Sequence, residues 1–229
     1  MQLAPEAYFQ LDGYAHRDLF AGVAYAWEVL QRLDGYLGQR LKPGVHGEVH
    51  PGAWVEGDVY IAPGAVVEAG AYVRGPVIIE EGAVVRHGAY VRGHCIIGAG
   101  CVVGHATELK RVIMLDGAQA PHFNYIGDSV LGRRVNLGAG TRLSNFKNDG
   151  SEVVVRNGTE RIPTGMRKFG AIVGDDVKTG CNAVLSPGTL IGPRSMVYPN
   201  AVLRGVYPAD HIVKLRQETV LVERSGTGW

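Results

Sequence analysis

The sequence predicts an all-β fold, a left-handed parallel β-helix of hexapeptide repeats with an N-terminal α-helix and one inserted loop. A branched aliphatic residue returns at every sixth position, and a smaller residue precedes most of them by two positions. Glycine is also abundant, at 33 of 229 residues, which suits many tight turns. The aliphatic positions are Val49, Val55, Ile61, Val67, Val73, Ile79, Val85, Val91, Ile97, Val103 and Leu109.

The repeat also predicts which side chains stack. Three six-residue steps close a triangular coil of 18 residues, and parallel strands of successive coils lie about 4.8 Å apart. Residues 18 apart should therefore form columns, and a five-residue step at 109–114 shortens that count by one. The expected columns are His87, His105 and His122 at one corner; Arg74, Arg92 and Lys110; and Tyr72, Tyr90, Glu108 and Tyr125.

The pattern divides the chain into three parts. A second run of repeats, from Val173 to Leu203, follows an interruption at about 147–170, so we expect one β-helix domain over 45–208 with a loop inserted in it. Residues 1–44 form an N-terminal segment whose apolar residues, over 17–41, recur at spacings of three and four, as in an amphipathic helix. We expect this helix to pack on the β-helix or on a neighbouring subunit, or else to bind a partner. Residues 209–229 form a C-terminal tail.

Composition excludes several classes of protein. The formal net charge is +1, so no global field attracts nucleic acid or an anionic membrane. No stretch approaches the roughly 20 apolar residues of a membrane span, and the N-terminus lacks a signal-peptide pattern, so we expect a cytoplasmic protein. Three cysteines are too few for a disulfide framework and match no zinc spacing.

Two of the columns suggest a binding site. Three stacked cations with no acid in register repel one another unless an anion binds them, and phosphate is the natural candidate; solvated surface charge is the alternative. His122 near Glu108 suggests a general base held by a carboxylate, whereas a corner histidine bonded to the backbone is the simpler interpretation. Stacked histidines also hold metal in hexapeptide-fold carbonic anhydrases, but two histidines five residues apart are absent here, so no metal site is predicted.

The stretch from 103 to 150, VGHATELKRVIMLDGAQAPHFNYIGDSVLGRRVNLGAGTRLSNFKNDG, resembles the acetyltransferase domain of bifunctional N-acetylglucosamine-1-phosphate uridyltransferase/glucosamine-1-phosphate acetyltransferases. Weaker similarity runs from about 50 to 205 and leaves out the N-terminal helix, and nothing resembles the uridyltransferase half. The resemblance implies an acyl-coenzyme A-dependent N-acyltransferase, using acetyl-CoA as co-substrate and a small-molecule sugar phosphate as acceptor. It also implies a homotrimer and a role in UDP-N-acetylglucosamine biosynthesis.

The same resemblance assigns roles to individual residues. His122 of PHFNY falls on the general base, with Glu108 of ELKR beside it. The residues implied in acceptor binding are Arg92, Lys110, Tyr125, Asn136, Asn145 and Lys168, and those implied in coenzyme binding are Ala139 and Cys181. This chain departs from the family at Phe146, where the family has a sugar-contacting Tyr, at Cys181, where it has Ser, and in about twenty extra residues over 148–167.

Alternative functions stay open at this point. The same cations suit a non-catalytic module that binds a sugar phosphate or nucleotide sugar, and the departures at Phe146 and Cys181 favour that reading. The extra residues favour an acyltransferase acting on another nucleotide sugar or using another acyl donor.

Overall fold

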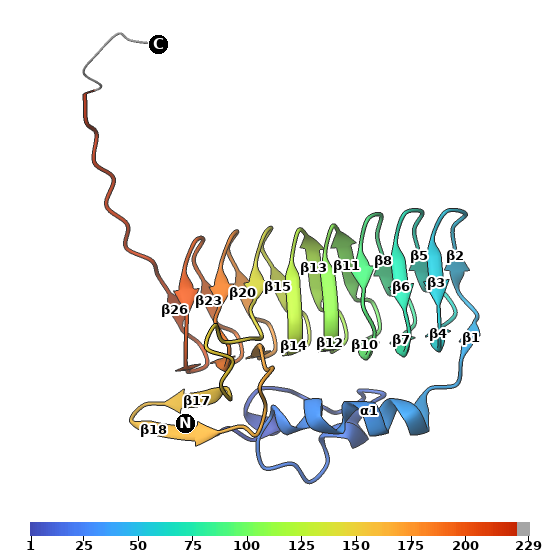
Figure 1. Cartoon of the computed structure of the whole chain (residues 1–229), viewed down its shortest axis with the longest axis horizontal. Coiled ribbons are helices and arrows are strands. Elements are labelled where there is room, and N and C mark those ends of the chain that lie inside the picture. The colour runs from blue at the N-terminus through green and yellow to red at the C-terminus, as the bar shows by residue number, and fades with distance from the viewer. Residues whose placement is uncertain (224–229) are drawn as a thin grey trace.

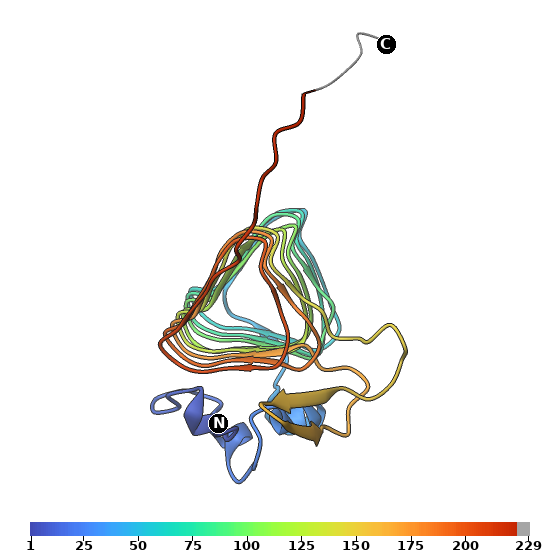
Figure 2. The ribbon, with the colours of Figure 1, turned by 90° about the vertical axis from the view of Figure 1, so that its left-hand side faces the viewer.

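The computed structural model describes residues 1–223 and shows a parallel β-helix of triangular cross-section (Figures 1 and 2). Its second face is a nine-stranded sheet, one strand for each coil. An N-terminal helical segment and a β-hairpin lie against one side of the triangle (Figure 2). The fold class predicted from the repeat is thereby confirmed.

The strands form three faces, which we number in chain order. The first face contains β1 (Gly44–Val45), β4 (Val59–Ile61), β7 (Val77–Ile79), β10 (Cys95–Ile97), β19 (Ala171–Val173), β22 (Thr189–Ile191) and β25 (Val206–Tyr207). The second contains β2 (Glu48–Val49), β5 (Val66–Val67), β8 (Val84–Val85), β11 (Val102–His105), β13 (Gln119–His122), β15 (Asn136–Leu137), β20 (Lys178–Thr179), β23 (Met196–Val197) and β26 (Ile212–Val213). The third contains β3 (Trp54–Glu56), β6 (Tyr72–Arg74), β9 (Tyr90–Val91), β16 (Arg142–Leu143), β21 (Val184–Leu185) and β24 (Val202–Leu203). Two long strands, β12 (Glu108–Met114) and β14 (Tyr125–Leu131), run from the third face around the corner into the first.

The register of the ladders confirms the predicted repeat. Val49 pairs with Val67 and Val67 with Val85, a spacing of 18 residues. Ile97 pairs with Met114, which is the 17-residue spacing expected from the five-residue step. A second short coil follows, because β12 pairs with β14 at the same 17-residue offset.

The inward positions form one aliphatic column along the axis. Every aliphatic repeat position from Ile61 to Leu109 is at most 1% exposed, and the second run from Val173 to Leu203 continues the same column to within 3% exposure. Val49 and Val55, in the first coil, are only partly buried because no coil covers them from below. Burial of such side chains contributes about 1.5–3 kcal/mol each, so this column is the main source of stability.

The N-terminal helix is shorter than the sequence suggested. The segment 17–41 contains a 3₁₀ turn at Arg17–Phe20 and an α-helix, α1, only over Glu28–Arg40; a second 3₁₀ turn lies at Pro5–Ala7. Gly22 adopts a left-handed backbone (φ +66°), which an α-helix cannot continue through. The carboxylate of Glu28 then accepts the N–H groups of Ala24 and Tyr25 at 2.8 and 3.0 Å, which fixes the start of α1.

The first face is apolar on its outer side as well, and α1 covers it. Val29, Leu30, Leu33 and Leu37 of the helix form a second buried cluster with the outward side chains of the first face. Those outward side chains are Ile78, Ile96, Ile113, Val130, Ile172 and Leu190. The expectation that the helix packs on the β-helix is therefore confirmed.

The inserted segment is a hairpin rather than an irregular loop. Strands β17 (Val154–Asn157) and β18 (Glu160–Pro163) pair antiparallel. The ring of Phe169, which follows the hairpin, lies 6.0 Å from that of Trp27, and Gln31 Nε2 donates to the carbonyl of Thr164 at 3.1 Å. The insert is thus fixed to the N-terminal segment.

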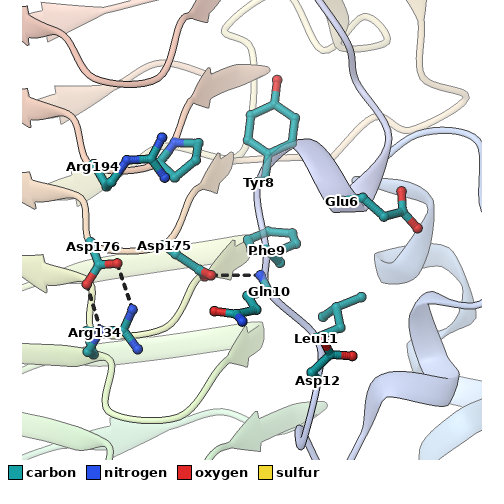
Figure 3. A pocket seen from close by; sticks show the side chains of 11 residues that line it. Glu6, Tyr8, Phe9, Gln10, Leu11, Asp12, Arg134, Asp175, Asp176 and Arg194 are labelled. Atoms are coloured by element: carbon teal, nitrogen blue, oxygen red, sulfur yellow. Dashed lines mark hydrogen bonds and ion pairs between the residues drawn. The ribbon is translucent and has the colours of Figure 1, made fainter.

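The chain start is held by Asp175 (Figure 3). Its carboxylate accepts the N–H groups of Gln10 and Arg133 at 2.8 and 2.7 Å, and its own N–H donates to the carbonyl of Tyr8. A cavity of about 510 Å³ lies along this seam. Its arginines are already committed, because Arg134 binds Asp176 and Arg194 binds Asp210, each at 2.7 Å.

The β-strands extend slightly beyond the expected limits of 45 and 208, since β1 begins at Gly44 and β26 ends at Val213. Of the predicted tail over 209–229, residues 224–229 lie outside the described part of the chain. Within residues 1–223, no helix has the length and apolar character needed to cross a membrane.

We predict that Ile113→Ala destabilises the protein by about 2–4 kcal/mol, because the side chain is fully buried between the first face and the N-terminal cluster. Equilibrium urea unfolding measures the loss. Val102→Ala is the matched control, since Val102 also points outward but lies on the second face, where no helix covers it; it should cost less than about 1.5 kcal/mol. Equal losses would contradict the covering role of α1.

Candidate active site

The stacking order predicted for the tyrosine column is confirmed. Tyr72 pairs with Tyr90, Tyr90 with Glu108, and Glu108 with Tyr125, all on the third face. Arg92 and Lys110 follow two residues after Tyr90 and Glu108, and so point outward from the same face. The third face therefore carries an acid, two cations and two phenols on three successive coils.

The cation column, in contrast, is not free of acids. We expected no acid in register, but Glu56 pairs directly with Arg74. Arg92 Nη1 lies 2.6 Å from Glu108 Oε1, and Lys110 Nζ lies 3.5 Å from Asp128 Oδ2. The prediction was wrong because long side chains reach acids one coil away and at the corner. Like-charge repulsion alone is therefore no argument for a bound anion.

The histidine column lines one corner, as predicted, but its members differ. Nδ1 of His87 donates to the carbonyl of Ala69 at 2.7 Å, and Nδ1 of His105 donates to that of His87 at 2.9 Å. Their rings stack at 5.5 Å with an interplanar angle of 5°. The backbone-bonded interpretation is therefore correct for these two histidines.

His122 breaks this ladder. The carbonyl of His105, which its ring would use, instead accepts the N–H of Phe123 at 2.9 Å. This happens because β11 and β13 stay paired as far as His105 and His122, so the main-chain ladder takes the acceptor. Gly104 permits the pairing, since a Cβ there would overlap the carbonyl of Pro121. Within residues 1–223 the imidazole of His122 has no hydrogen-bond partner, and the residue is exposed.

Glu108 does not hold His122. We predicted that its carboxylate orients the imidazole, but the structure shows it bound to Arg92 at 2.6 Å. Glu108 lies within the third face, whereas His122 ends the second face at the corner between the two. The contact would require Glu108 to leave Arg92.

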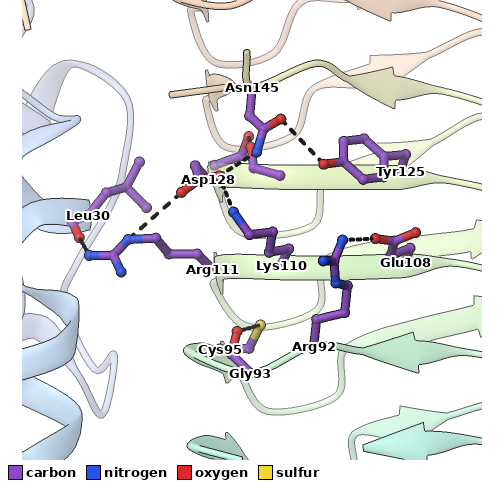
Figure 4. Close-up of polar contacts among 12 residues, drawn as sticks. Leu30, Arg92, Gly93, Cys95, Glu108, Lys110, Arg111, Tyr125, Asp128 and Asn145 are labelled. Atoms are coloured by element: carbon purple, nitrogen blue, oxygen red, sulfur yellow. Dashed lines mark hydrogen bonds and ion pairs between the residues drawn. The ribbon is translucent and has the colours of Figure 1, made fainter. Parts of the chain in front are cut away.

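A hydrogen-bonded network links the phenol to the cations (Figure 4). The hydroxyl of Tyr125 donates to Asn145 Oδ1 at 3.3 Å, and Asn145 Nδ2 donates to Asp128 Oδ2. Lys110 Nζ approaches the same carboxylate oxygen, and Arg111 Nε lies 3.8 Å from Oδ1. Burial, with the nearby charges of Glu108 and Asp128, raises the pKa of Tyr125, so the phenol keeps its proton.

A cavity of about 440 Å³ opens beside this network, at the corner between the third and first faces. Three of the predicted acceptor-binding residues line it, namely Arg92, Lys110 and Lys168. Leu30 and Gln31 of α1, and Met166 and Arg167 of the insert, form its outer wall. His122, Glu108 and Tyr125 do not line this cavity. We expected all the site residues in a single pocket, but they are spread across the third face, with the cations at one edge and the imidazole at the other.

The remaining predicted residues lie on either side of that face. Asn145 is buried in the network, whereas Asn136 is exposed on the second face, in register with Gln119 and Lys178. His122, Ala139 and Cys181 follow one another along one corner, as their backbone bonds show: Gly140 N–H donates to the His122 carbonyl at 3.0 Å and Asn182 N–H to that of Ala139 at 2.8 Å. Cys181 is exposed.

Sequence reasoning missed Asp128, the centre of the network, which is 3% exposed. The sequence feature that could have indicated it is an acid between Gly127 and Ser129. The backbone there is left-handed (φ +43°), a conformation in which Asp is tolerated better than most residues. Within residues 1–223, no group of three or more His, Cys, Asp or Glu is arranged to hold a metal ion.

Comparison with known proteins finds two matching family models and several similar relatives. A model described as the GMPPB C-terminal domain matches residues 73–180, and one described as bacterial transferase hexapeptide (six repeats) matches 170–205. A bifunctional protein GlmU from Methanococcus maripaludis (strain C7) is 40% identical over 215 residues, which is 94% of this chain and 51% of the relative. This chain is therefore similar, over nearly its whole length, to the acetyltransferase part of GlmU proteins.

Other relatives match less of the chain or match it at lower identity. A bifunctional sugar-1-phosphate nucleotidylyltransferase/acetyltransferase from Sulfurisphaera tokodaii is 42% identical over 98 residues, covering 43% of this chain and 24% of the relative. A GlmU protein from Methanocaldococcus jannaschii is 30% identical over 92% of this chain and 50% of its own length. This chain thus spans about half the length of the GlmU relatives that match nearly all of it.

The match with the GlmU relatives reaches further than we expected. Residues 45–229 cannot hold a 215-residue match, so it includes much of the N-terminal segment that we left out of the resemblance. Among solved structures, the UDP-N-acetylglucosamine acyltransferase of Francisella novicida is 12% identical with a TM-score of 0.41, over 70% of this chain and 60% of that one. A likeness of that degree carries no functional argument.

We predict that the three corner histidines differ in tautomer. Imidazole ¹⁵N–¹H correlation spectra at pH 8 should show His87 and His105 as Nδ1–H tautomers, because each donates to a carbonyl. His122 should show the averaged shifts of a free imidazole. Single His→Gln variants assign the signals, and a fixed Nδ1–H tautomer at His122 would contradict the hydrogen-bonding difference.

Proposed function

We propose that the protein is an acyl-coenzyme A-dependent N-acyltransferase that uses acetyl-CoA to acetylate an amino-sugar phosphate such as glucosamine-1-phosphate. The observation that carries the proposal is the third face, which has a cationic cavity at one edge and an unbonded imidazole at the other. Similarity to the Sulfurisphaera tokodaii relative, which is named a sugar-1-phosphate nucleotidylyltransferase/acetyltransferase, supports it.

In this proposal the cavity binds the phosphate. Arg92, Lys110 and Lys168 line it, and Lys168 has no acid partner among residues 1–223. Arg92 and Lys110 are held in ion pairs that are 40% and 27% exposed on the cationic side, so an incoming phosphate can compete for them. Tyr125 and Asn145 then contact the sugar from the third face, and Asn136 contacts it from the adjoining second face.

The proposed chemistry needs a base, because an amino sugar is mostly protonated at neutral pH and only the free amine attacks a thioester. His122 takes that proton, and the free amine then forms the C–N bond at the acetyl carbon. The C–S bond breaks as the nitrogen gives up its second proton to the leaving sulfur, so the coenzyme departs as a thiol. Since Glu108 is bound to Arg92, its role here is to hold that arginine rather than to orient the imidazole.

We place the acyl donor along the corner that continues from His122. Ala139 and Cys181 succeed it there, one on each following coil. The N–H of Ala139 donates no hydrogen bond within residues 1–223, so it is available to the oxyanion that develops on the thioester carbonyl. A thiol at Cys181 is a weaker donor than the family's hydroxyl.

We also propose a homotrimer. The N-terminal segment and the insert cover the first face, which leaves the second and third for contacts between copies. Exposed apolar side chains lie on those two faces, namely Trp54, Tyr90, Met196, Tyr198 and Val202. The cytoplasmic location stays a prediction.

Light scattering coupled to gel filtration tests the trimer, with an expected mass three times that of the 24.6 kDa chain. Trp54→Glu and Val202→Glu place charge on the third face and should lower the mass, whereas Val45→Glu, at the edge of the first face, should leave it unchanged. A monomeric wild-type protein at micromolar concentration would refute this assembly.

A thiol-release assay with acetyl-CoA and glucosamine-1-phosphate tests the activity and the base. His122→Ala should lower kcat about 100-fold or more, as expected for loss of a general base. His105→Ala is the control, since that ring is bonded to the backbone, and its kcat should stay within about threefold of wild type. Unchanged turnover in His122→Ala would refute the assigned base, and sugar-phosphate binding without turnover would identify a binding module.

A further inference from the structure

A buried carboxylate in a cationic cavity requires explanation. Asp128 is 3% exposed, lines the cavity, and carries its charge where we place the acceptor's phosphate. Glycine takes the left-handed position of this corner in other coils, at Gly93 before the network and Gly188 after it. Arg111 and Asp128 put side chains there in successive coils, as His94 does in the coil before them, and Arg111 and Asp128 both belong to the network.

We propose that Asp128 is a positioning residue of this site. In the free protein it is the counter-anion of Lys110, and the phosphate of the acceptor takes that role over on binding. Asp128 meanwhile keeps Asn145, and through it Tyr125, aligned on the third face. This inference rests on the proposed acyl transfer and adds a residue and an exchange of partners to it.

The first support is that Arg111 is committed elsewhere. Its Nη1 lies 2.9 Å from both carboxylate oxygens of Asp34 in α1, and its Nη2 donates to the carbonyl of Leu30 at 2.8 Å. Its Nε, at 3.8 Å from Asp128, is beyond hydrogen-bonding distance. The helix therefore holds Arg111, and the close partners of Asp128 are Lys110 and Asn145.

The second support is that these two partners are held differently. Lys110 Nζ is 3.5 Å from Asp128, longer than the ~2.7–3.2 Å of most N–H···O bonds, and its side chain is 27% exposed toward the cavity. A lysine on a flexible stem can turn to a ligand at small cost. Asn145 is 7% exposed and makes a close bond to the same oxygen, so it stays when Lys110 leaves.

The third support is that the carboxylate fixes which way the amide of Asn145 points. A carboxylate only accepts hydrogen bonds, so the NH₂ group must face Asp128 and the carbonyl oxygen must face Tyr125. The phenol then donates to that oxygen at 3.3 Å. An uncharged amide in place of Asp128 would accept or donate a hydrogen bond equally well, so the amide of Asn145 would no longer be held in one orientation.

The test is Asp128→Asn, which removes the charge and keeps the shape. Calorimetric titration with inorganic phosphate should give a Kd about tenfold lower than wild type, because Lys110 loses its internal competitor. In the acetyl transfer assay, KM for glucosamine-1-phosphate should fall and kcat should fall about tenfold. If the variant simply contained less active protein, kcat would fall, but neither the Kd for phosphate nor the KM for glucosamine-1-phosphate would decrease.

Asp176→Asn is the matched control. Asp176 is also an aspartate at a left-handed corner (φ +60°) bound to an arginine, but it lies away from the cavity and should leave phosphate affinity and kinetics unchanged. Asn145→Ala is the complementary variant, and remains informative if Asp128→Asn does not fold. It should lower kcat while phosphate Kd stays within twofold, because Lys110 keeps its partner.

The outcomes separate the two proposals. Unchanged phosphate affinity in Asp128→Asn overturns the counter-anion role, whatever the activity. Tighter phosphate binding with no turnover by the wild-type protein supports the exchange at Lys110 and refutes acyl transfer. A kcat in Asn145→Ala equal to that of wild type overturns the alignment of Tyr125 through Asn145.

Discussion

The in-register stacking of parallel strands is the constraint on which the rest of this structure depends. Each residue on the outer surface has a neighbour one coil above and one below, at the spacing of the ladder. Side chains far apart in sequence, such as those of Tyr90, Glu108 and Tyr125, thus meet because whole coils separate them. The two 17-residue coils preserve this order, since all strands of a coil shift together.

The same stacking gives the first face an apolar outer surface, because its outward side chains are as apolar as its inward ones. Helix α1 and the insert cover this surface and shield it from solvent. Their second effect is at the corner beside the third face, where Gln31 and Arg167 wall the cationic cavity and Asp34 holds Arg111. Elements that seal the fold thereby shape one end of the site.

Much of this could be predicted from the sequence, because periodicity reports what a backbone repeats. The coil length, the short coils, the core column and the stacked tyrosines and histidines all follow from counting. Ile78, Ile96 and Ile113 also signalled the covered face, since each stands between two inward apolar residues, a pattern expected of strands buried on both sides. Partners chosen by side-chain rotamer could not be predicted: Glu108 turns to Arg92, and Lys110 turns to Asp128. The hairpin within the insert also lies outside the repeat, so counting said nothing about it.

Gly104 shows how finely the main chain controls the chemistry of this surface. Because β11 and β13 approach closely at this glycine, the N–H of Phe123 donates to the carbonyl of His105. In the two preceding coils the equivalent carbonyls accept a bond from an imidazole instead. One methyl group here would push the strands apart and return that acceptor to the ring. In the proposed mechanism, a variant lacking this glycine would keep every side chain that meets a substrate and still lose the free imidazole that accepts the proton.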